Sequence, residues 1–318
     1  MHRPNPTVRG TLSAALLAGD MPALRAQEAP APTAPAGVIE SARLSMRSTT
    51  LWLASSVDSW FGDIPFEEGG QVTDGRLSFS LLLREHEKPD WNLRFNARFR
   101  LPNLERRAYL FVGRDDEREL VSDRPGTLSR PQQLLPENRD DSTFFAGFGV
   151  TLRDALDFRL GLRGGLKPYA QARWRRPWQI DEARRVELRL TFFWSLDDHL
   201  GSTTALSYEQ ALSPVLAARW VTAGTVTQVS ETLEWSSLVG LHRAFGTQRL
   251  LSLEALVNRR LDSGVGASDY GVQLRCEQPL HRQGLFGDIL VGHCWPREDA
   301  ESERVRAWAL GGQLKLKF

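Results

Sequence analysis

The clearest pattern in the chain is an alternation of apolar and polar residues from Arg304 to Phe318. One set holds Trp308, Leu310, Gly312, Leu314 and Leu316, and the other holds Ala309, Gly311, Gln313, Lys315 and Lys317. Because successive side chains of a β-strand point to opposite faces, this alternation predicts a terminal strand with one apolar and one polar face.

The same pattern repeats along most of the chain. Residues 91–101 are the cleanest case: Trp91, Leu93, Phe95, Ala97, Phe99 and Leu101 share one face, and Asn92, Arg94, Asn96, Arg98 and Arg100 share the other. The predicted strands are 76–84, 91–101, 106–114, 143–152, 157–178, 184–196, 202–212, 215–229, 232–244, 249–260, 268–278, 285–295 and 304–318. Short polar connections separate most of them. The long polar stretch 116–141 is predicted to be an extracellular loop.

These strands predict an all-β fold, a transmembrane antiparallel β-barrel of 12–14 strands with a short N-terminal amphipathic helix. Residues 157–178 are too long for one span of about 9–11 residues. A three-residue hairpin loop at Arg163-Gly164-Gly165, with Leu162 and Leu166 paired, splits the segment and gives the favoured count of fourteen. A single tall strand, with a weaker strand elsewhere removed, gives the alternative of twelve.

The N-terminal part has a different composition. Residues 1–26 have a basic start, a short apolar core and a cleavage point at Ala26, which predicts a signal peptide; a disordered extension is the alternative. Residues 27–40 are rich in Pro and Ala and predict a linker. Residues 41–66 carry Leu53, Val57, Trp60 and Phe61 at helical spacing, which predicts a periplasmic amphipathic helix before the barrel at 76–318.

Composition narrows the class further. The net charge of +1 gives no indication of nucleic-acid binding. The mean hydropathy is −0.34 and no run of 18 or more apolar residues appears, which excludes a helical membrane span. The ten Trp residues suit aromatic girdles, although a soluble β-sandwich is an alternative explanation. The predicted membrane-interface aromatics are Trp91, Trp178, Trp194, Trp235, Trp295, Trp308 and Phe318. Cys276 and Cys294 fall on opposite faces, so no disulfide is expected. No metal site or cofactor is predicted.

Several blocks of sequence carry a resemblance. DSWFGDIPFEEGG, FRLPNLERRAYLFVGRDDERELV, FRLGLRGGLKPYAQARWR, LGSTTALSYEQALSP, LEWSSLVGL and VGHCWPRED resemble recurring blocks in a family of uncharacterised proteobacterial outer-membrane barrel proteins. The resemblance covers about residues 57–318. It implies the same fold and a location in the outer membrane of the Gram-negative envelope, and it implies no activity.

The predicted inner face is rich in charge. The residues expected to line the lumen are Arg94, Arg98, Arg100, Arg159, Arg163, Arg173, Arg175, Arg189, Glu209, Glu234, Glu254, Arg275, Glu277 and Lys315. One hypothesis is a channel whose Arg-rich wall, led by Arg94, Arg98 and Arg100, prefers anions. The other is a structural barrel whose lumen is filled and stiffened by salt bridges, or a plugged barrel that binds a ligand or partner.

An enzyme is the weaker hypothesis, and we assign no catalytic residue. A barrel hydrolase acting on lipid or envelope polymer needs a nucleophile beside a base. His242 is expected to face the lumen near Ser236, and His293 is expected to face lipid without a Ser beside it. The expected partners are outer-membrane lipid, lipopolysaccharide and, through the terminal strand ending at Phe318, the barrel assembly machinery.

Overall fold

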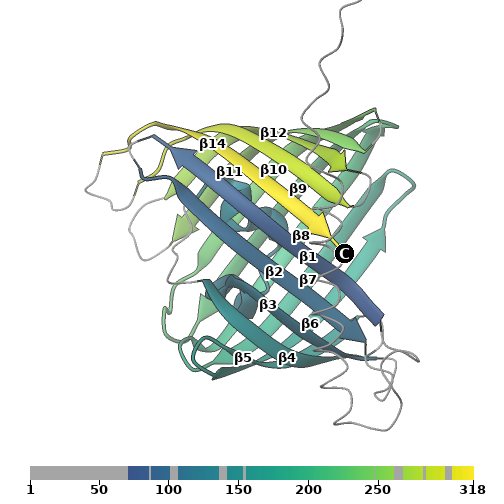
Figure 1. Ribbon diagram of the computed structural model, residues 1–318, viewed down its shortest axis with the longest axis vertical. Helices are drawn as coiled ribbons and strands as arrows, with labels where there is room; N and C mark the ends of the chain where they lie inside the picture. Colours follow the sequence, from purple (N-terminus) through teal and green to yellow (C-terminus); the bar gives the residue numbers. More distant parts are fainter. Residues whose placement is uncertain are drawn as a thin grey trace, which may run out of the picture.

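The computed structural model describes residues 71–85, 87–100, 107–135, 142–152, 155–246, 248–260, 268–281, 284–297 and 303–318. Fourteen antiparallel strands form one closed barrel (Figure 1). They are β1 (Gln71–Arg84), β2 (Asp90–Arg100), β3 (Ala108–Asp116), β4 (Ser142–Leu152), β5 (Leu156–Arg163), β6 (Lys167–Gln179), β7 (Arg184–Ser195), β8 (His199–Ser213), β9 (Leu216–Thr227), β10 (Glu234–Phe245), β11 (Arg249–Arg260), β12 (Asp269–His281), β13 (Leu285–Cys294) and β14 (Ala307–Lys317).

The topology is the simplest that closes a barrel. Each strand pairs with its neighbours in the chain, and β1 pairs with β14, so that Arg76 lies opposite Lys317 and Arg84 opposite Ala309. Because the strand number is even, β1 begins and β14 finishes at the same end of the barrel. We call this the terminal end and the opposite one the loop end. The fourteen-strand prediction is confirmed, and the twelve-strand alternative is wrong.

The alternation in the sequence sets the two faces of the wall. Exposed apolar side chains cover the outside, including Phe144, Leu160, Phe192 and Ile289, while polar and charged side chains of the same strands point inward. Closure leaves no unpaired sheet edge, which is the condition for a β-structure surrounded by lipid. The free thiols of Cys276 and Cys294 lie on opposite faces, as predicted.

The hairpin that splits 157–178 differs by one position from the prediction. Arg163 pairs with Lys167, and Leu162 pairs with Pro168, so the turn is Gly164-Gly165-Leu166. The predicted pairing of Leu162 with Leu166 is therefore wrong. Gly165 and Leu166 both adopt positive φ, at 70° and 65°. This register brings Arg163 and Lys167 together on the inner face.

Glycines opposite aromatic residues shape the inner face of β3 to β8. Tyr109 lies against Gly149, Phe111 against Gly147, Phe145 against Gly113, Tyr169 against Gly161 and Phe193 against Gly201, each with its direct cross-strand partner. A Cβ on any of these glycines would lie 2.3–2.7 Å from the facing ring. The rings therefore lie flat on the wall. We call Tyr109, Phe111, Phe145, Tyr169 and Phe193 the aromatic floor.

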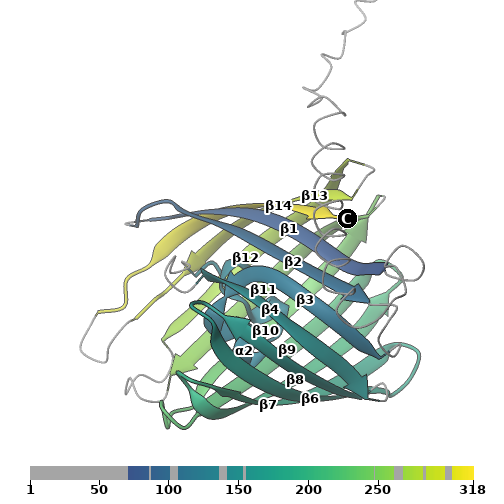
Figure 2. The same cartoon turned by 60° about the horizontal axis from the view of Figure 1, so that its bottom comes forward.

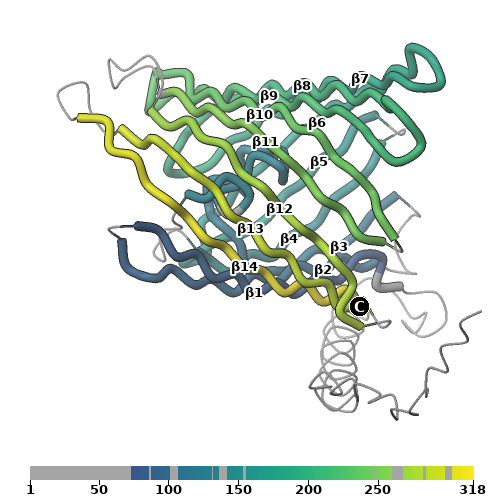
Figure 3. Tube along the Cα trace, turned by 90° about the horizontal axis from the view of Figure 1, so that it is seen from above, coloured from purple at the N-terminus to yellow at the C-terminus, as the bar shows by residue number. Residues whose placement is uncertain are grey.

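The connection from β3 to β4 enters the barrel. It contains α2 (Glu117–Ser122), η2 (Gly126–Leu128) and η3 (Arg130–Gln133), and Figures 2 and 3 show its coils inside the ring of strands. Asp116 caps α2 by accepting hydrogen bonds from the Arg118 and Glu119 N–H groups. We call residues 117–135 the inserted segment. The prediction that the whole of 116–141 lies outside as a polar loop is wrong for this part.

The predicted signal peptide, linker and helix, residues 1–66, lie outside the described residues. Among the residues that the structure does describe, no helix has the length and apolar character needed to cross a membrane.

Candidate functional site

The inserted segment enters the lumen because apolar side chains on it meet apolar patches on the wall. Val121 of α2 is buried against the aromatic floor, with Leu120 beside it. These rings point inward, so without the segment they would face water inside the barrel. Burying one such side chain stabilises by about 1.5–3 kcal/mol.

Two further apolar contacts hold the other end of the segment. Leu128 of η2 is buried among Ala205, Val221, Ala223 and Leu238 of β8, β9 and β10. Leu134 packs against Leu290 and Ala309 on β13 and β14. A Cβ on Gly292 would overlap the Leu134 side chain, so the missing side chain of that glycine makes room for this contact. The segment thus reaches from the β3–β7 wall to the β13–β14 wall.

Polar anchors accompany the apolar ones. Gln171 Nε2 donates to the Leu120 carbonyl at 2.7 Å and also to the Val121 carbonyl. On the opposite wall, Gln273 Nε2 donates to the Gln132 carbonyl at 2.7 Å, and Arg275 donates to both the carbonyl and the side-chain oxygen of Gln132. These bonds satisfy carbonyls that the short helices leave unpaired.

A charge cluster fixes the start of the segment at the loop end. The Arg163 guanidinium, only 1% exposed, lies 3.1 Å from Glu117 and 3.0 Å from Asp197. Lys167 lies 3.1 Å from Asp197 as well. The hydrogen bond from Lys167, aided by the charge of Arg163, lowers the pKa of Asp197 below its usual range. The hairpin register described above is what places both cations here.

All of the predicted lumen residues point inward, and most of the cations have carboxylate partners. Arg94 lies 3.1 Å from Asp115, and Lys315 lies 2.8 Å from Glu277. Further pairs join Arg159 to Asp157, Arg173 to Asp157 and Asp123, Arg189 to Asp123, Arg219 to Glu209, Arg124 to Glu234, and Arg275 to Asp288. Glu254 accepts a hydrogen bond from Gln273 at 2.6 Å.

Charge is nevertheless unevenly distributed. Arg98, Arg100 and Arg175 have no carboxylate partner among the described residues, and Arg98 instead lies over the Tyr109 ring at 4.3 Å. We call Arg98, Arg100, Arg159, Arg173, Arg175 and Arg189, on β2, β5, β6 and β7, the arginine track. Among the described residues, the ion pairs of these six arginines are made with two aspartates, Asp123 and Asp157. The nearby Glu187 pairs instead with Arg185, at 3.2 Å.

Tyr109 and Asp157 organise the track. The Tyr109 hydroxyl donates to the Asp157 carboxylate at 2.7 Å and accepts from Arg159 Nε at 3.0 Å. The sequence analysis gave no role to either residue, nor to Asp123. For Tyr109 the sequence did hold an indication, because Tyr109 and Phe111 are aromatic residues on a face that the alternation predicts to be polar.

One acid of the inserted segment is strongly perturbed. Burial raises the pKa of Glu119 to about 7, although Arg94 nearby opposes the shift. Glu119 Oε1 also accepts a hydrogen bond from the Arg130 backbone N–H at 2.9 Å, which ties α2 to η3.

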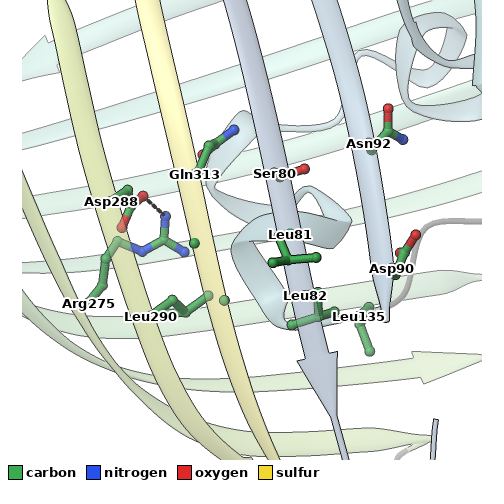
Figure 4. A pocket seen from close by; sticks show the side chains of 12 residues that line it. Ser80, Leu81, Leu82, Asp90, Asn92, Leu135, Arg275, Asp288, Leu290 and Gln313 are labelled. Atoms are coloured by element: carbon green, nitrogen blue, oxygen red, sulfur yellow. Dashed lines mark hydrogen bonds and ion pairs between the residues drawn. The ribbon is translucent and has the colours of Figure 1, made fainter. Parts of the chain in front are cut away.

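A small cavity remains beside the segment, where Leu135 faces β13, β14, β1 and β2 (Figure 4). Ser80, Asn92 and Gln313 line it with neutral polar groups, and the Arg275–Asp288 ion pair lies at its side. Its volume of about 30 Å³ holds only a few water molecules. On this side the segment therefore lies close to the wall.

The two histidines considered for hydrolysis have neighbours that the sequence did not predict. His242 faces the lumen as predicted, but its Nδ1 lies 2.8 Å from Ser252 rather than beside Ser236. Ser252 is 2% exposed, which leaves its hydroxyl covered. His293 faces outward, as predicted, and packs between Trp295 and Trp308 with ring centroids 4.4 and 4.6 Å away.

The predicted interface aromatics lie on the outer face, toward the two ends of the barrel. Trp91, Trp194, Trp235, Trp295 and Trp308 are near the loop end, and Trp178 and Phe318 are near the terminal end. Phe318 stacks on Phe95 with centroids 6.2 Å apart. Tyr208 and Trp220, paired across β8 and β9, add outward aromatics that the sequence analysis did not select.

Solved structures with similar folds include outer-membrane channels and porins. The outer-membrane channel DcaP of Acinetobacter baumannii matches 79% of this chain and 98% of its own, at 9% identity and a TM-score of 0.48. An anion-selective porin from Comamonas acidovorans matches 78% of this chain and 100% of its own, at 8% identity and a TM-score of 0.45. No family model and no curated protein matches the sequence. Similarity at this level extends to the overall barrel alone.

Proposed function

We propose that this chain is an outer-membrane channel whose lumen is narrowed by the inserted segment and whose arginine track makes passage prefer anions. The observation that carries the proposal is that, among the described residues, two aspartates form the ion pairs of six arginines on one wall of the lumen. Arg100 and Arg175 are exposed, so their unneutralised charges face the solvent in the lumen and attract small anions.

The ion pairs in the structure change which arginines are expected to set the anion selectivity. Arg94 was expected to act with Arg98 and Arg100, but it lies 3.1 Å from Asp115 and 3.7 Å from Glu119. Its charge is therefore largely cancelled. Arg98, Arg100 and Arg175 should set the selectivity instead.

Selectivity can be measured as the reversal potential of the refolded protein in planar bilayers under a salt gradient. Replacing Arg98, Arg100 and Arg175 by Ser should move the reversal potential toward cation preference. The matched control, Arg94→Ser, should move it much less. Equal shifts in the two variants, or none in a conducting triple variant, would reject the arginine track as the source of selectivity.

The role of the inserted segment is tested by replacing residues 118–134 with a short Gly/Ser linker. Conductance should rise several-fold, because the segment reaches walls on both sides of the lumen. Folding of the variant is checked by heat-modifiable gel mobility. A folded variant that conducts no better than the parent would show that the segment does not limit the passage.

The proposal also assigns the orientation of the barrel in the outer membrane and its partners. We place the terminal end toward the periplasm and the loop end toward the exterior, with the exposed apolar outer face in lipid and lipopolysaccharide around it. The terminal strand ending at Phe318 is the proposed contact for the barrel assembly machinery. Membership of the family of uncharacterised proteobacterial outer-membrane barrels belongs to the proposal too, on the sequence blocks between 57 and 318.

A further inference from the structure

The arginine track contains a carboxylate-binding site that the inserted segment itself fills. Asp123 follows directly after α2, and its carboxylate meets three donors on β6 and β7. It lies 3.1 Å from Arg173, 3.2 Å from the Thr191 hydroxyl and 3.5 Å from Arg189. We call Arg173, Arg189 and Thr191 the Asp123 receptor.

Asp123 is the acid of the segment that reaches the track. Glu117 pairs with Arg163 at the loop end, and Glu119 accepts from the Arg130 N–H group. Asp123 has a positive φ of 52°, which is uncommon for a residue other than glycine. α2 thus ends in a left-handed cap, a conformation that aspartate adopts more readily than most residues, and this turn presents the carboxylate to the wall.

The Asp123 receptor and its neighbours carry an excess of positive charge when Asp123 has moved away from them. Arg175 lies directly opposite Arg189 in the β6–β7 register, and Arg98 has no carboxylate partner among the described residues. Without Asp123, Asp157 would be the one carboxylate among the described residues that forms an ion pair with the six arginines of the track. An excess of like charge on a partly desolvated wall strongly favours binding of an external anion.

We propose that the Asp123 receptor binds solutes carrying a carboxylate, and that a bound solute replaces Asp123 and frees this part of the inserted segment from the wall. Arg173 Nη1 donates to both carboxylate oxygens of Asp123, at 3.1 and 3.3 Å, and the Thr191 hydroxyl donates to one of them at 3.2 Å, so the carboxylate of a solute can accept the same bonds. This inference rests on the channel proposal for its physiological meaning, since release of the segment would open the passage to the solute that triggers it.

Binding is measured by titration calorimetry of the full chain, refolded in zwitterionic detergent, with citrate as the probe. Asp123→Asn removes the internal competitor, so it should bind citrate about tenfold or more tightly than the parent. The control Asp197→Asn removes a carboxylate from the Arg163 cluster and should bind as the parent does. Adding Arg173→Gln to Asp123→Asn should abolish binding. Equal affinity in the parent and Asp123→Asn, persistence of binding without Arg173, or no binding in any variant would overturn the proposal.

Asp123→Glu keeps the charge and guards against a folding artefact. If it is folded and binds citrate as weakly as the parent, the gain in Asp123→Asn comes from the vacated receptor. A gain in Asp123→Glu equal to that in Asp123→Asn would contradict internal competition.

Release of the segment is read by thiol labelling. In a chain with Cys276 and Cys294 replaced by Ser, Leu128→Cys places a thiol at a site that is buried in the parent. Citrate should raise the labelling rate several-fold, and an unchanged rate despite binding would reject the displacement step. Neither readout needs ion flow. A protein that binds but never conducts would reject the channel alone, and one that conducts without binding would reject this inference alone.

Discussion

The two halves of the lumen wall meet the inserted segment in opposite ways. On β3 to β7 the wall supplies most of the apolar side chains in the contact. Five aromatic rings lie flat over glycines there, and the segment adds only Val121 and Leu120. On β8 to β14 the wall is lined by small residues such as Ala205, Ala223 and Ala309, and the segment supplies Leu128 and Leu134.

The halves also differ in charge. On the β8–β14 side the inward cations Arg219, Arg275 and Lys315 each have a carboxylate within 3.1 Å, while Lys317 lies over the Phe286 ring at 4.7 Å. On the β2–β7 side Arg98, Arg100 and Arg175 have none among the described residues. Paired charges can fill and stiffen a lumen, whereas unpaired ones can act on solutes. The pore and the salt-bridge network that the sequence left as alternatives thus occupy different sides of one barrel.

The largest effect expected is on the aromatic side, from Arg163→Met. The Arg163 side chain is 1% exposed and holds Glu117 of the inserted segment, so its loss leaves Glu117, among the described residues, with only the more distant Lys167, 4.0 Å away. We expect the free energy of unfolding to fall by about 3 kcal/mol, measured by urea denaturation of the refolded barrel. The control Arg185→Met breaks an exposed ion pair and should cost less than about 1 kcal/mol. Equal losses would show that the Arg163 cluster is no anchor.

The next largest effect is a pH dependence of the docking of the inserted segment, caused by Glu119 of α2. With a pKa of about 7, Glu119 keeps a proton in the docked segment that it would lose from the released one. Docking is therefore favoured below the ordinary carboxyl range and weakens as pH rises from about 4.5 to 7, by up to about 3 kcal/mol. The labelling rate of Leu128→Cys, divided by that of a free thiol at the same pH because the thiolate fraction itself rises, should accordingly increase with pH. Glu119→Gln should flatten that rise, and a slope unchanged by Glu119→Gln would contradict the assignment.

The alternation along the strands was enough to predict the wall. It assigned the outward faces of β2, β4, β7 and β14 and the inward direction of every charged residue selected, because a period of two leaves one choice once the apolar face meets lipid. Closure into fourteen strands followed from the Gly164-Gly165 break. The exact turn did not, since a three-residue loop at 163–165 or at 164–166 gives the same alternation of faces.

The inserted segment was not predicted because its evidence is spread over distant parts of the chain. Its own composition is largely polar, and its few apolar residues follow no regular spacing. What draws it inward is the inward position of Tyr109, Phe145 and Phe193 with glycines facing them, and these pairs are recognisable only once the register is known. Ion pairs such as Arg94–Asp115 depend on the same long-range register.

The glycines of the aromatic floor can be tested directly with Gly149→Val. A Cβ there would lie 2.3 Å from Tyr109, so the ring must move and the hydrogen bond from Tyr109 to Asp157 must lengthen or break. We expect a loss of about 1–3 kcal/mol in urea denaturation. Gly312→Val is the matched control on the other half of the barrel, where the nearest atom is 4.0 Å away and the position faces outward. A loss at Gly312 as large as at Gly149 would mean that the glycines do not serve the rings.

The smallest expected effect is an increase in the free energy of unfolding, opposite in sign to the losses above. It concerns the hairpin that aligns Arg163 with Lys167. Leu166 is 77% exposed and has φ at 65°, a conformation that disfavours a branched apolar residue and suits glycine. Leu166→Gly should therefore raise the free energy of unfolding by about 0.5–1 kcal/mol, because strain is removed and no buried contact is lost. The predicted register, which pairs Leu166 with Leu162 inside the strand, requires the reverse, since glycine weakens a strand interior. The sign of this small change therefore decides between the two turns, and with them whether Arg163 and Lys167 can bind Asp197 together.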